Sequence, residues 1–293
     1  MRILVTGSSG LLGSRIVALM EQLGHEVFSA YSVHSPSAGK PIRLDLTNLE
    51  DIPRAVEQAY PEIIIHAASV TDVDACEEDP GIAMRVNGEA TGRVGEAAHK
   101  IGAYVIYVST DYVFDGKAGN YREGDETNPV NHYGMSKLHG ERLLAKSGAS
   151  YCIARTSVVY GWGRGYRPNF ATWVLSRLRS NTPLKVVNDQ FASPTLNLNL
   201  AEMLVNLAEK RCEGIMHLAG ATRADRYSFA LQIAEALKLN RNLIEPVTSN
   251  SISWKAKRPR DSSLNIQKAT SALDRKPMKL GEALERFRAG STN

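Results

Sequence analysis

The chain has 293 residues, 43% of them hydrophobic and 23% charged, which is typical of a globular protein with one large domain or two smaller ones. Its formal net charge is only +4, and its basic residues are interspersed with 31 acidic ones, which argues against a nucleic-acid-binding surface. The odd number of cysteines, 3 in all, makes a disulfide framework unexpected, and the 7 histidines show no metal-binding spacing. The first residues read as a strand rather than a signal peptide, and no apolar run approaches the roughly 20 residues of a membrane span. We therefore expect a cytoplasmic protein without a metal, membrane or nucleic-acid partner.

Short apolar runs alternate with helical patterns through the first half of the chain. Strands are expected at 3–5, 26–30, 62–66, 104–108 and 151–154, with a further short strand just before Asp45. Helices are expected at 11–23, 49–59, 83–101 and 132–147. Nearly continuous apolar strands separated by helices indicate a parallel sheet that is covered on both faces. Because crossovers are right-handed, we predict an α/β fold with a doubly wound parallel sheet of the Rossmann type.

The rhythm changes after about residue 160. The stretch 161–169 is rich in glycine, arginine and aromatic residues and reads as a loop. Helices are expected at 170–179, 198–210, 228–237 and 280–288, with an extended run at 185–187 and a polar loop at 257–263. We expect residues 1–160 to form the dinucleotide-binding domain, with 190–212 packing back on it. Residues 161–293 are expected to form mainly a smaller C-terminal substrate-binding lobe.

A glycine-rich turn lies between the first predicted strand and the first predicted helix. Glycine lets the backbone turn tightly and come close to a pyrophosphate, and the helix N-terminus offers N–H donors to the phosphates. In this strand–turn–helix context the turn predicts dinucleotide binding. The residues expected to contact the cofactor here are Gly7, Ser9, Gly10, Leu11, Leu12 and Gly13.

A second motif is the pair Tyr133 and Lys137, which share one face of the predicted helix. An ammonium beside a phenol favours the phenolate, so we expect Lys137 to lower the pKa of Tyr133. Tyr133 then becomes a candidate proton donor for an alcohol/ketone couple. By itself such a pair is more often an amphipathic helix with an exposed lysine, and its value comes from the glycine turn before it.

The glycine spacing G-x-x-G-x-x-G resembles that of the extended short-chain dehydrogenase/reductase family. Three further positions agree with this resemblance. Asp45 and Leu46 stand where the family contacts the adenine, and Thr110 stands where it keeps a catalytic serine or threonine. The small residues that would line the cofactor cleft after the fourth strand are Ala67, Ala68 and Ser69.

Longer segments narrow the resemblance to the dTDP-4-dehydrorhamnose reductase subfamily. They are 109–116, 133–141, 155–161, 189–195 and 258–262, and with the glycine turn they cover nearly the whole chain. The resemblance implies hydride transfer between a nicotinamide dinucleotide and the C4 carbonyl of a nucleotide-linked 4-keto-6-deoxy sugar. Tyr133 would donate the proton, Lys137 would also hold the nicotinamide ribose, and Thr110 would orient the carbonyl oxygen.

Flanking residues complete the expected site. The resemblance places Thr71 and Val73 beside the nicotinamide and the sugar, although a helix N-cap by Thr71 or its neighbour is equally compatible with the segment. Asp111 and Tyr112 are expected to face the sugar. Asn87 is either structural or part of a proton relay.

Two further residues are expected to bind the substrate diphosphate. They are Asn169 and Arg258, or Arg260 in its place, because the arginine fork matches phosphate geometry. The alternative for the arginines is a solvated basic loop. Val158 stands where the subfamily commonly carries a tryptophan that packs on the sugar, so the exact sugar and the nucleotide base stay open.

The cofactor preference depends on the end of the second strand. NAD-preferring sites usually carry an acid there, and the segment 30–34 has none. We therefore expect NADPH, with NADH left open, because no arginine stands there to bind a 2′-phosphate unless Arg15 or Lys40 reaches it.

Two other functions remain open. The segments 111–116, 121–123 and 258–260 also resemble the regulatory β subunit of methionine adenosyltransferase, a non-catalytic dinucleotide-binding partner of an S-adenosylmethionine synthetase. Retention of Thr110, Tyr133 and Lys137 favours the enzyme. Another nucleotide-sugar substrate is the third reading. Some members of the reductase subfamily are metal-bridged dimers; no carboxylate cluster here demands a metal, and a homodimer stays open.

Overall fold

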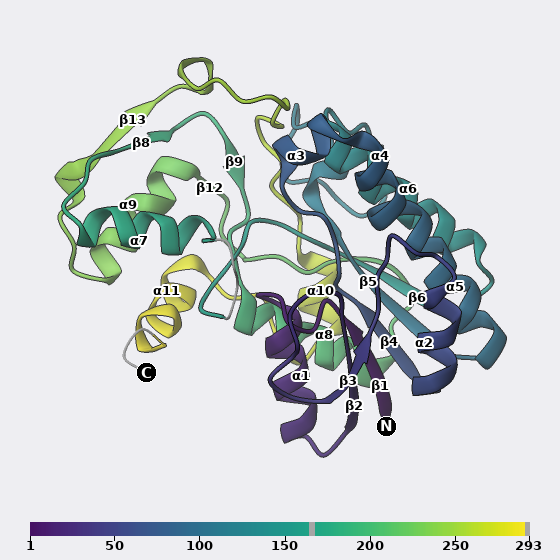
Figure 1. Cartoon of the computed structure of the whole chain (residues 1–293). Helices are drawn as coiled ribbons and strands as arrows, with labels where there is room; N and C mark the ends of the chain where they lie inside the picture. The colour runs from purple at the N-terminus through teal and green to yellow at the C-terminus, as the bar shows by residue number, and fades with distance from the viewer. Residues whose placement is uncertain (164–167, 291–293) are drawn as a thin grey trace.

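The computed structural model of the chain describes residues 1–163 and 168–290 (Figure 1). Its centre is a seven-stranded sheet in the order β11-β6-β5-β4-β1-β2-β3, with parallel pairing throughout. The chain winds outward from β1 in one direction and from β4 in the other, so the predicted α/β doubly wound Rossmann fold is confirmed. The strands are β1 (Arg2–Thr6), β2 (Glu26–Tyr31), β3 (Lys40–Arg43), β4 (Ile63–His66), β5 (Tyr104–Thr110), β6 (Tyr151–Thr156) and β11 (Gly214–His217).

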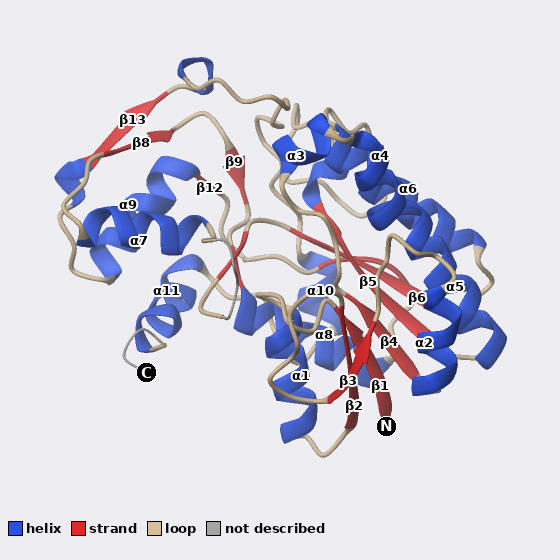
Figure 2. Cartoon of the chain, in the orientation of Figure 1, coloured by secondary structure: helices blue, strands red, loops and turns tan. Residues whose placement is uncertain are grey.

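Helices cover both faces of this sheet (Figure 2). One face carries α1 (Gly13–Gln22), α8 (Asn197–Lys210) and α10 (Gln267–Ala272), and the other carries α2 (Asp51–Ala59), α5 (Ala90–Ile101) and α6 (His132–Lys146). Successive side chains of a strand point to opposite faces. Ile3 and Val5 of β1 accordingly pack in the first layer and Leu4 in the second. Burial on both sides is the reason that the strand sequences are nearly continuously apolar.

The segment 83–101, predicted as one helix, has a more complex structure. It begins with α4 (Pro80–Ala83), continues as a π-helical turn, η1 (Met84–Glu89), and ends as α5. A π-turn places an extra residue in the helix and is typical of functional sites. A short helix, α3 (Val73–Glu78), precedes it and begins where a helix N-cap was one of the two alternatives left open. The other predicted helices agree with the structure to within about two residues at each end.

The second half of the chain builds a lobe that lies beside the sheet (Figure 1). It contains α7 (Phe170–Arg179), α9 (Arg226–Ala236), α11 (Leu280–Ala289) and the parallel pair β8 (Leu184–Val187) and β13 (Ile244–Val247). Its core is aromatic, with Tyr160 edge-on to Phe229 and Phe287. Short pairs join it to the sheet: β7 (Val159–Tyr160) with β10 (Thr195–Leu196), and β9 (Phe191–Ala192) with β12 (Ala224–Asp225). Within the predicted loop 161–169, residues 164–167 lie outside the described residues.

The chain crosses between the sheet and the lobe more than once. The buried residues of α8, Met216 of β11 and those of α10 belong to the core beside α1. The buried residues around α7, α9 and α11 belong to the separate core of the lobe. The strand β11 was not predicted, and it is the part of the range 161–293 that joins the sheet itself, beside β6. Among the described helices, none is long and apolar enough to cross a membrane.

Candidate active site

A cleft of about 890 Å³ lies at the carboxyl edge of the sheet, facing the lobe. The carboxyl ends of strands beside the switch point of a doubly wound sheet, here between β1 and β4, are where such folds bind ligands. All the residues predicted to bind the cofactor line it, and so do the predicted substrate residues except Arg258 and its alternative Arg260. The lining residues among those predicted are Gly7, Ser9, Gly10, Leu11, Leu12, Gly13, Asp45, Leu46, Ala67, Ala68, Ser69, Thr71, Val73, Thr110, Asp111, Tyr112, Tyr133, Lys137 and Asn169.

The glycine turn is packed so closely that side chains are excluded. Gly7 has a φ of +67°, and a Cβ there would lie 2.8 Å from the Cα of Ala68. A Cβ on Gly13 would lie 2.1 Å from the carbonyl oxygen of Gly7. No described side chain caps the N-terminus of α1, and backbone carbonyls accept from the N–H groups of Ser14 and Arg15. No described hydrogen bond occupies the N–H groups of 11–13, so these can bind a ligand. The turn therefore fits a pyrophosphate, which nicotinamide dinucleotides carry.

Asn87, in the π-turn, is a structural bridge. Its Oδ1 accepts hydrogen bonds from Ser69 Oγ and from the backbone N–H of Val70, both at 2.8 Å. Its Nδ2 donates to Val70 O and to Ser136 Oγ, both at 3.0 Å. Because these bonds occupy the amide and the residue is fully buried, the side chain has a structural role. It ties the cofactor wall to the helix that carries Tyr133.

Tyr133 and Thr110 meet in the middle of the cleft. The helix α6 begins just before Tyr133 because Asn131 caps it, accepting from the N–H of Gly134 at 2.8 Å. The Tyr133 ring packs edge-on against Tyr112, with ring centroids 5.8 Å apart. Burial raises the pKa of Tyr133 well above its usual range, and the Thr110 hydroxyl opposes that rise. A phenol that keeps its proton is the form needed to protonate a developing alkoxide.

The expectation that Lys137 lowers the pKa of Tyr133 is wrong for this structure. The Lys137 ammonium donates to the carbonyl oxygen of Val108 at 2.7 Å and lies 4.1 Å from the centroid of the Tyr107 ring. Burial lowers the pKa of Lys137 itself to about 7. Burial, rather than the ammonium, therefore controls the pKa of the Tyr133 phenol.

Asp111 is a buried hydrogen-bond acceptor in the wall of the cleft. Its Oδ2 accepts hydrogen bonds from Ser157 Oγ at 2.8 Å and from Ser262 Oγ at 2.5 Å. Its Oδ1 accepts from Thr110 Oγ1 at 3.1 Å. Burial raises the pKa of its carboxyl, although these hydroxyls oppose the rise. The carboxyl thus joins the ends of β5 and β6 to the segment after β13 and orients the Thr110 hydroxyl.

Two predicted contacts sit at helix starts. Asp72, rather than Thr71, caps α3, accepting from two N–H groups of its first turn at 3.0 and 3.1 Å. Thr71 is exposed in the cleft wall, and Val73 begins the helix beside it. Asn169 caps α7 and donates from Nδ2 to the carbonyl oxygen of Gly161 at 2.8 Å. Its side chain therefore fixes the start of α7 at the edge of the cleft.

Among the described residues that line the cleft, the segment 30–34 at the end of β2 contributes no acid. Ser32 and His34 line it there. Arg15 donates from Nη2 to a carbonyl oxygen of the lobe at 3.1 Å, and Lys40 pairs with Glu26 at 2.5 Å. Neither cation is among the described residues that line the cleft. The polar side chains that line the cleft at the end of β2 are thus those of Tyr31, Ser32 and His34.

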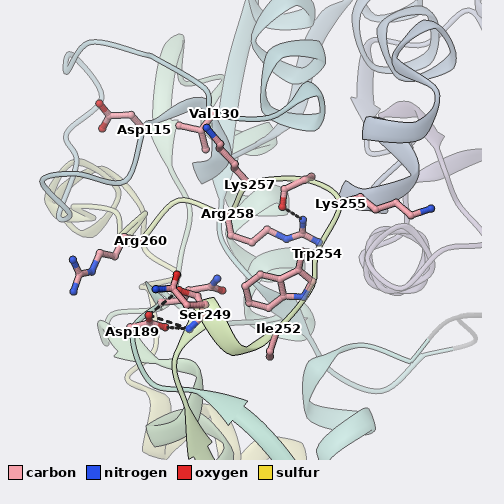
Figure 3. Close-up of a pocket in the computed structure, with 13 residues that line it drawn as sticks. Asp115, Val130, Asp189, Ser249, Ile252, Trp254, Lys255, Lys257, Arg258 and Arg260 are labelled. Carbon is pink, nitrogen blue, oxygen red and sulfur yellow. Dashed lines mark hydrogen bonds between the residues drawn. The ribbon is translucent and has the colours of Figure 1, made fainter.

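Arg258 lies in a second cavity, of about 560 Å³, next to the cleft (Figure 3). Its guanidinium forms a bidentate ion pair with Asp74 in α3, with both N···O distances at 2.8 Å. The guanidinium also lies 5.4 Å from the centroid of the Trp254 ring. Figure 3 shows Arg258 and Trp254 side by side and Arg260 pointing away from them. Because Asp74 follows Val73 directly, the basic cavity adjoins the cleft wall. Its cationic lining residues are Lys255, Lys257, Arg258 and Arg260.

Two lining residues have features that the sequence did not reveal. Arg226, at the start of α9, lies over the Phe170 ring at 5.1 Å, and its charge opposes the rise that burial imposes on the pKa of Tyr112. No motif surrounds it, because it reaches the cleft from the lobe.

Val158 has a φ of +43°, a conformation that is strained for a β-branched residue. Among the described residues, no three His, Cys, Asp or Glu side chains gather as a metal site.

A family model described as the RmlD substrate binding domain matches residues 1–292. The dTDP-4-dehydrorhamnose reductase of Aggregatibacter actinomycetemcomitans is 34% identical, with 98% of each chain covered. The corresponding reductase of Escherichia coli is also 34% identical, over 92% of this chain and 90% of that one. Methionine adenosyltransferase 2 subunit beta of Bos taurus is 31% identical, over 91% of this chain and 81% of that one.

Solved structures agree with these sequence matches. A dTDP-4-dehydrorhamnose reductase from Clostridium acetobutylicum superposes with a TM-score of 0.89 and 29% identity, covering 100% of both chains. A second one, from Bacillus anthracis in complex with NADP, gives a TM-score of 0.88 at 29% identity, with 99% of both chains covered.

Proposed function

The chain belongs to the RmlD substrate binding domain family, and from this premise we propose that it is an NADPH-dependent reductase acting on the C4 ketone of a nucleotide-linked 4-keto-6-deoxy sugar. One observation carries the proposal. A single cleft contains a backbone cradle that fits a pyrophosphate and, beyond it, the side chains of Thr110, Tyr133 and Lys137. Both halves of a ketone reduction, a dinucleotide and a proton donor, have a place there.

Different residues of the cleft would bind the pyrophosphate, the adenine end and the nicotinamide end of the cofactor. Bound NADPH would supply the hydride. Gly7, Gly10 and Gly13 would hold its pyrophosphate, Asp45 would contact the adenine end, and Lys137 would hold the nicotinamide ribose. The β2 end without an acid supports NADPH, as does the NADP bound to the relative from Bacillus anthracis. NADH is the second donor to test.

The chain's own residues manage the proton. Tyr133 donates it to the carbonyl oxygen as negative charge develops there, and burial keeps the phenol protonated until that moment. The Thr110 hydroxyl donates to Asp111 Oδ1 at 3.1 Å in this structure, and it would turn its proton to the same carbonyl oxygen when the substrate binds. Lys137, anchored on Val108 O, places a positive charge beneath the site.

We assign the dinucleotide to residues 1–160 together with 190–212, and the nucleotide-sugar to the lobe within 161–293. The cleft residues that would face the sugar are Val73, Asp111, Tyr112 and Asn169. The diphosphate would reach the basic cavity that adjoins Val73. Asp74 already holds both prongs of the Arg258 guanidinium there, so the diphosphate would bind the N–H groups that this ion pair leaves over.

Replacing Arg258 with alanine should therefore raise the KM for the nucleotide-sugar by roughly tenfold or more, because a charged hydrogen-bond donor to the diphosphate is lost. The dissociation constant for NADPH should stay unchanged. Steady-state kinetics and fluorescence titration measure the two quantities. Arg223→Ala is the matched control, since Arg223 pairs with Asp261 and is not among the described residues lining either cavity. An unaltered KM in Arg258→Ala would remove Arg258 from the substrate site.

The central test is oxidation of NADPH, followed by absorbance, with freshly prepared dTDP-4-keto-6-deoxy-mannose-type substrate. We expect turnover that requires both substrates and yields the 4-hydroxy sugar. A panel with other nucleotide bases and other 4-keto sugars then ranks the substrates by kcat/KM. Absence of turnover above that of Tyr133→Phe throughout the panel would contradict the proposal.

A non-catalytic regulatory subunit is the second candidate. It is supported by the 31% identity to methionine adenosyltransferase 2 subunit beta. The test is a pull-down from the source cells with the full chain, in the presence and absence of NADPH. Stoichiometric recovery of an S-adenosylmethionine synthetase, together with no ketone reduction, would favour this function over the reductase.

A further inference from the structure

A buried polar cluster lies behind the reacting end of the cleft. Arg155 of β6 pairs with Glu141 of α6 through two contacts, Nε to Oε1 at 3.0 Å and Nη2 to Oε2 at 2.7 Å. Ser109, at the end of β5, donates its hydroxyl to Glu141 Oε1 at 2.5 Å. The exposed fraction of each of these three residues is 4% or less. One carboxylate thus joins two strands to one helix out of contact with solvent.

Lys137 lies on the same helix, α6, and contacts the same strand, β5. Lys137 and Glu141 are four residues apart and share one face of α6. They contact consecutive residues of β5, since Lys137 binds Val108 O and Glu141 binds Ser109 Oγ. Thr110 follows directly. The pair of contacts therefore sets where α6, and with it Tyr133, sits against the strand that carries Thr110.

We propose that Glu141 is a positioning residue of the reductase: held by Arg155 and Ser109, its carboxylate fixes α6 against the end of β5 and places a negative charge one helical turn from Lys137. The proposal rests on the proposed function only where it concerns turnover. The geometric part stands on the contacts among Glu141, Arg155 and Ser109.

The electrostatic surroundings of Lys137 support this role. Burial lowers the pKa of Lys137 to about 7, whereas Glu141 raises it. The other titratable groups that act on Lys137 or pack against it are neutral near pH 7. Burial lowers the pKa of His66 to about 3 and raises that of Cys76 to about 11, and it also raises those of Tyr107 and Tyr133. Among the described groups that act on Lys137, Glu141 therefore supplies the negative charge that opposes its desolvation.

The first measurement needs no substrate. A buried lysine whose pKa in the folded state lies below its unfolded value of about 10.4 makes the unfolded chain bind more protons between the two values. The free energy of unfolding contributed by Lys137 therefore rises with pH above about 7. A plot of the free energy of unfolding against pH should therefore change slope near the folded-state pKa of Lys137, and we call this change of slope the bend. Urea unfolding across pH 5–9, compared between the native chain and Lys137→Met, isolates it.

Glu141→Gln keeps the shape and one acceptor for Ser109 but removes the charge. We expect the bend to move at least about one pH unit lower, a tenfold change in the proton affinity of Lys137. Glu141→Asp, which keeps the charge, should return the bend toward its native position. Glu141→Gln combined with Arg155→Gln removes the guanidinium that the single variant leaves unpaired, and it serves where the single variant folds poorly. A bend at the native pH in either folded Gln variant overturns the proposal.

The second measurement uses turnover. The alkaline limb of kcat should move in the same direction and by a similar amount in Glu141→Gln, with the NADPH dissociation constant nearly unchanged at pH 6. A purely structural role would lower kcat at all pH values without moving the limb. If no nucleotide-sugar is reduced but the unfolding bend moves, the proposed function fails while the positioning role stands. If turnover is normal and neither limb nor bend moves, the positioning role fails.

Discussion

Tyr133→Phe should lower kcat by about 10²–10⁴-fold, the range expected when a positioned general acid is lost. The ring remains, so its edge-on packing against Tyr112 persists and the change reports on the hydroxyl. We therefore expect the dissociation constants of NADPH and of the sugar nucleotide to change by less than about threefold. Single-turnover reduction, followed by NADPH absorbance, measures the chemical step directly.

Tyr160→Phe is the matched control. Tyr160 is fully buried in the core of the lobe, and its hydroxyl has no hydrogen-bond partner among the described residues. Removing that hydroxyl should leave kcat unchanged, because it lies outside the cleft lining. Equal rates for Tyr133→Phe and the native chain would show that another group supplies the proton.

Gly13→Ala should weaken NADPH binding by roughly 100-fold. The added Cβ would lie 2.1 Å from the carbonyl oxygen of Gly7 and 2.7 Å from its carbon, so the turn or α1 must move. Both are backbone and cannot rotate aside as a side chain would. A forced backbone shift of this kind costs about 1–3 kcal/mol, and about 1.4 kcal/mol is a tenfold change in affinity. Fluorescence titration with NADPH measures the loss.

Gly281→Ala separates this effect from the general cost of adding a methyl group. Gly281 also lies in the first turn of a helix, α11, but a Cβ there meets nothing within 4 Å. We expect native affinity for NADPH and a gain of about 0.5–1 kcal/mol in stability from helix propensity. Urea unfolding of both variants checks that Gly13→Ala is folded at the temperature of the titration. Native affinity in folded Gly13→Ala would refute the assigned role of the turn.

The sequence predicted what local patterns encode. The sheet followed from apolar runs such as Ile63–His66, whose burial on both faces requires apolar side chains at successive positions. The glycine turn was legible because its requirement is local: Gly7 has a positive φ and Gly13 packs against Gly7 itself. The predicted cofactor residues line one cleft because the carboxyl ends of parallel strands converge.

What the sequence did not reveal depends on contacts between distant segments. The edge strand β11 is half-buried at its first two residues, so its pattern carries no strong apolar run. Arg226 enters the cleft from the lobe, and its place depends on how α9 packs. The pKa of Tyr133 was predicted in the wrong direction because spacing along a helix says nothing of burial, or of the carbonyl oxygen on which Lys137 rests.

The repeated crossing of the chain between its two cores affects how the molecule can open and be divided. A fragment that ends at residue 160 would lack β11 and α8, which complete the sheet and one of its covering layers. The remaining fragment would contain the lobe and also β11 and α8, without the rest of the sheet on which they pack. Neither half is therefore a severable module. Several crossings of the chain connect the lobe to the sheet, and together they restrain any rotation of the lobe about the cleft. The two walls of the cleft therefore cannot move apart about a single hinge.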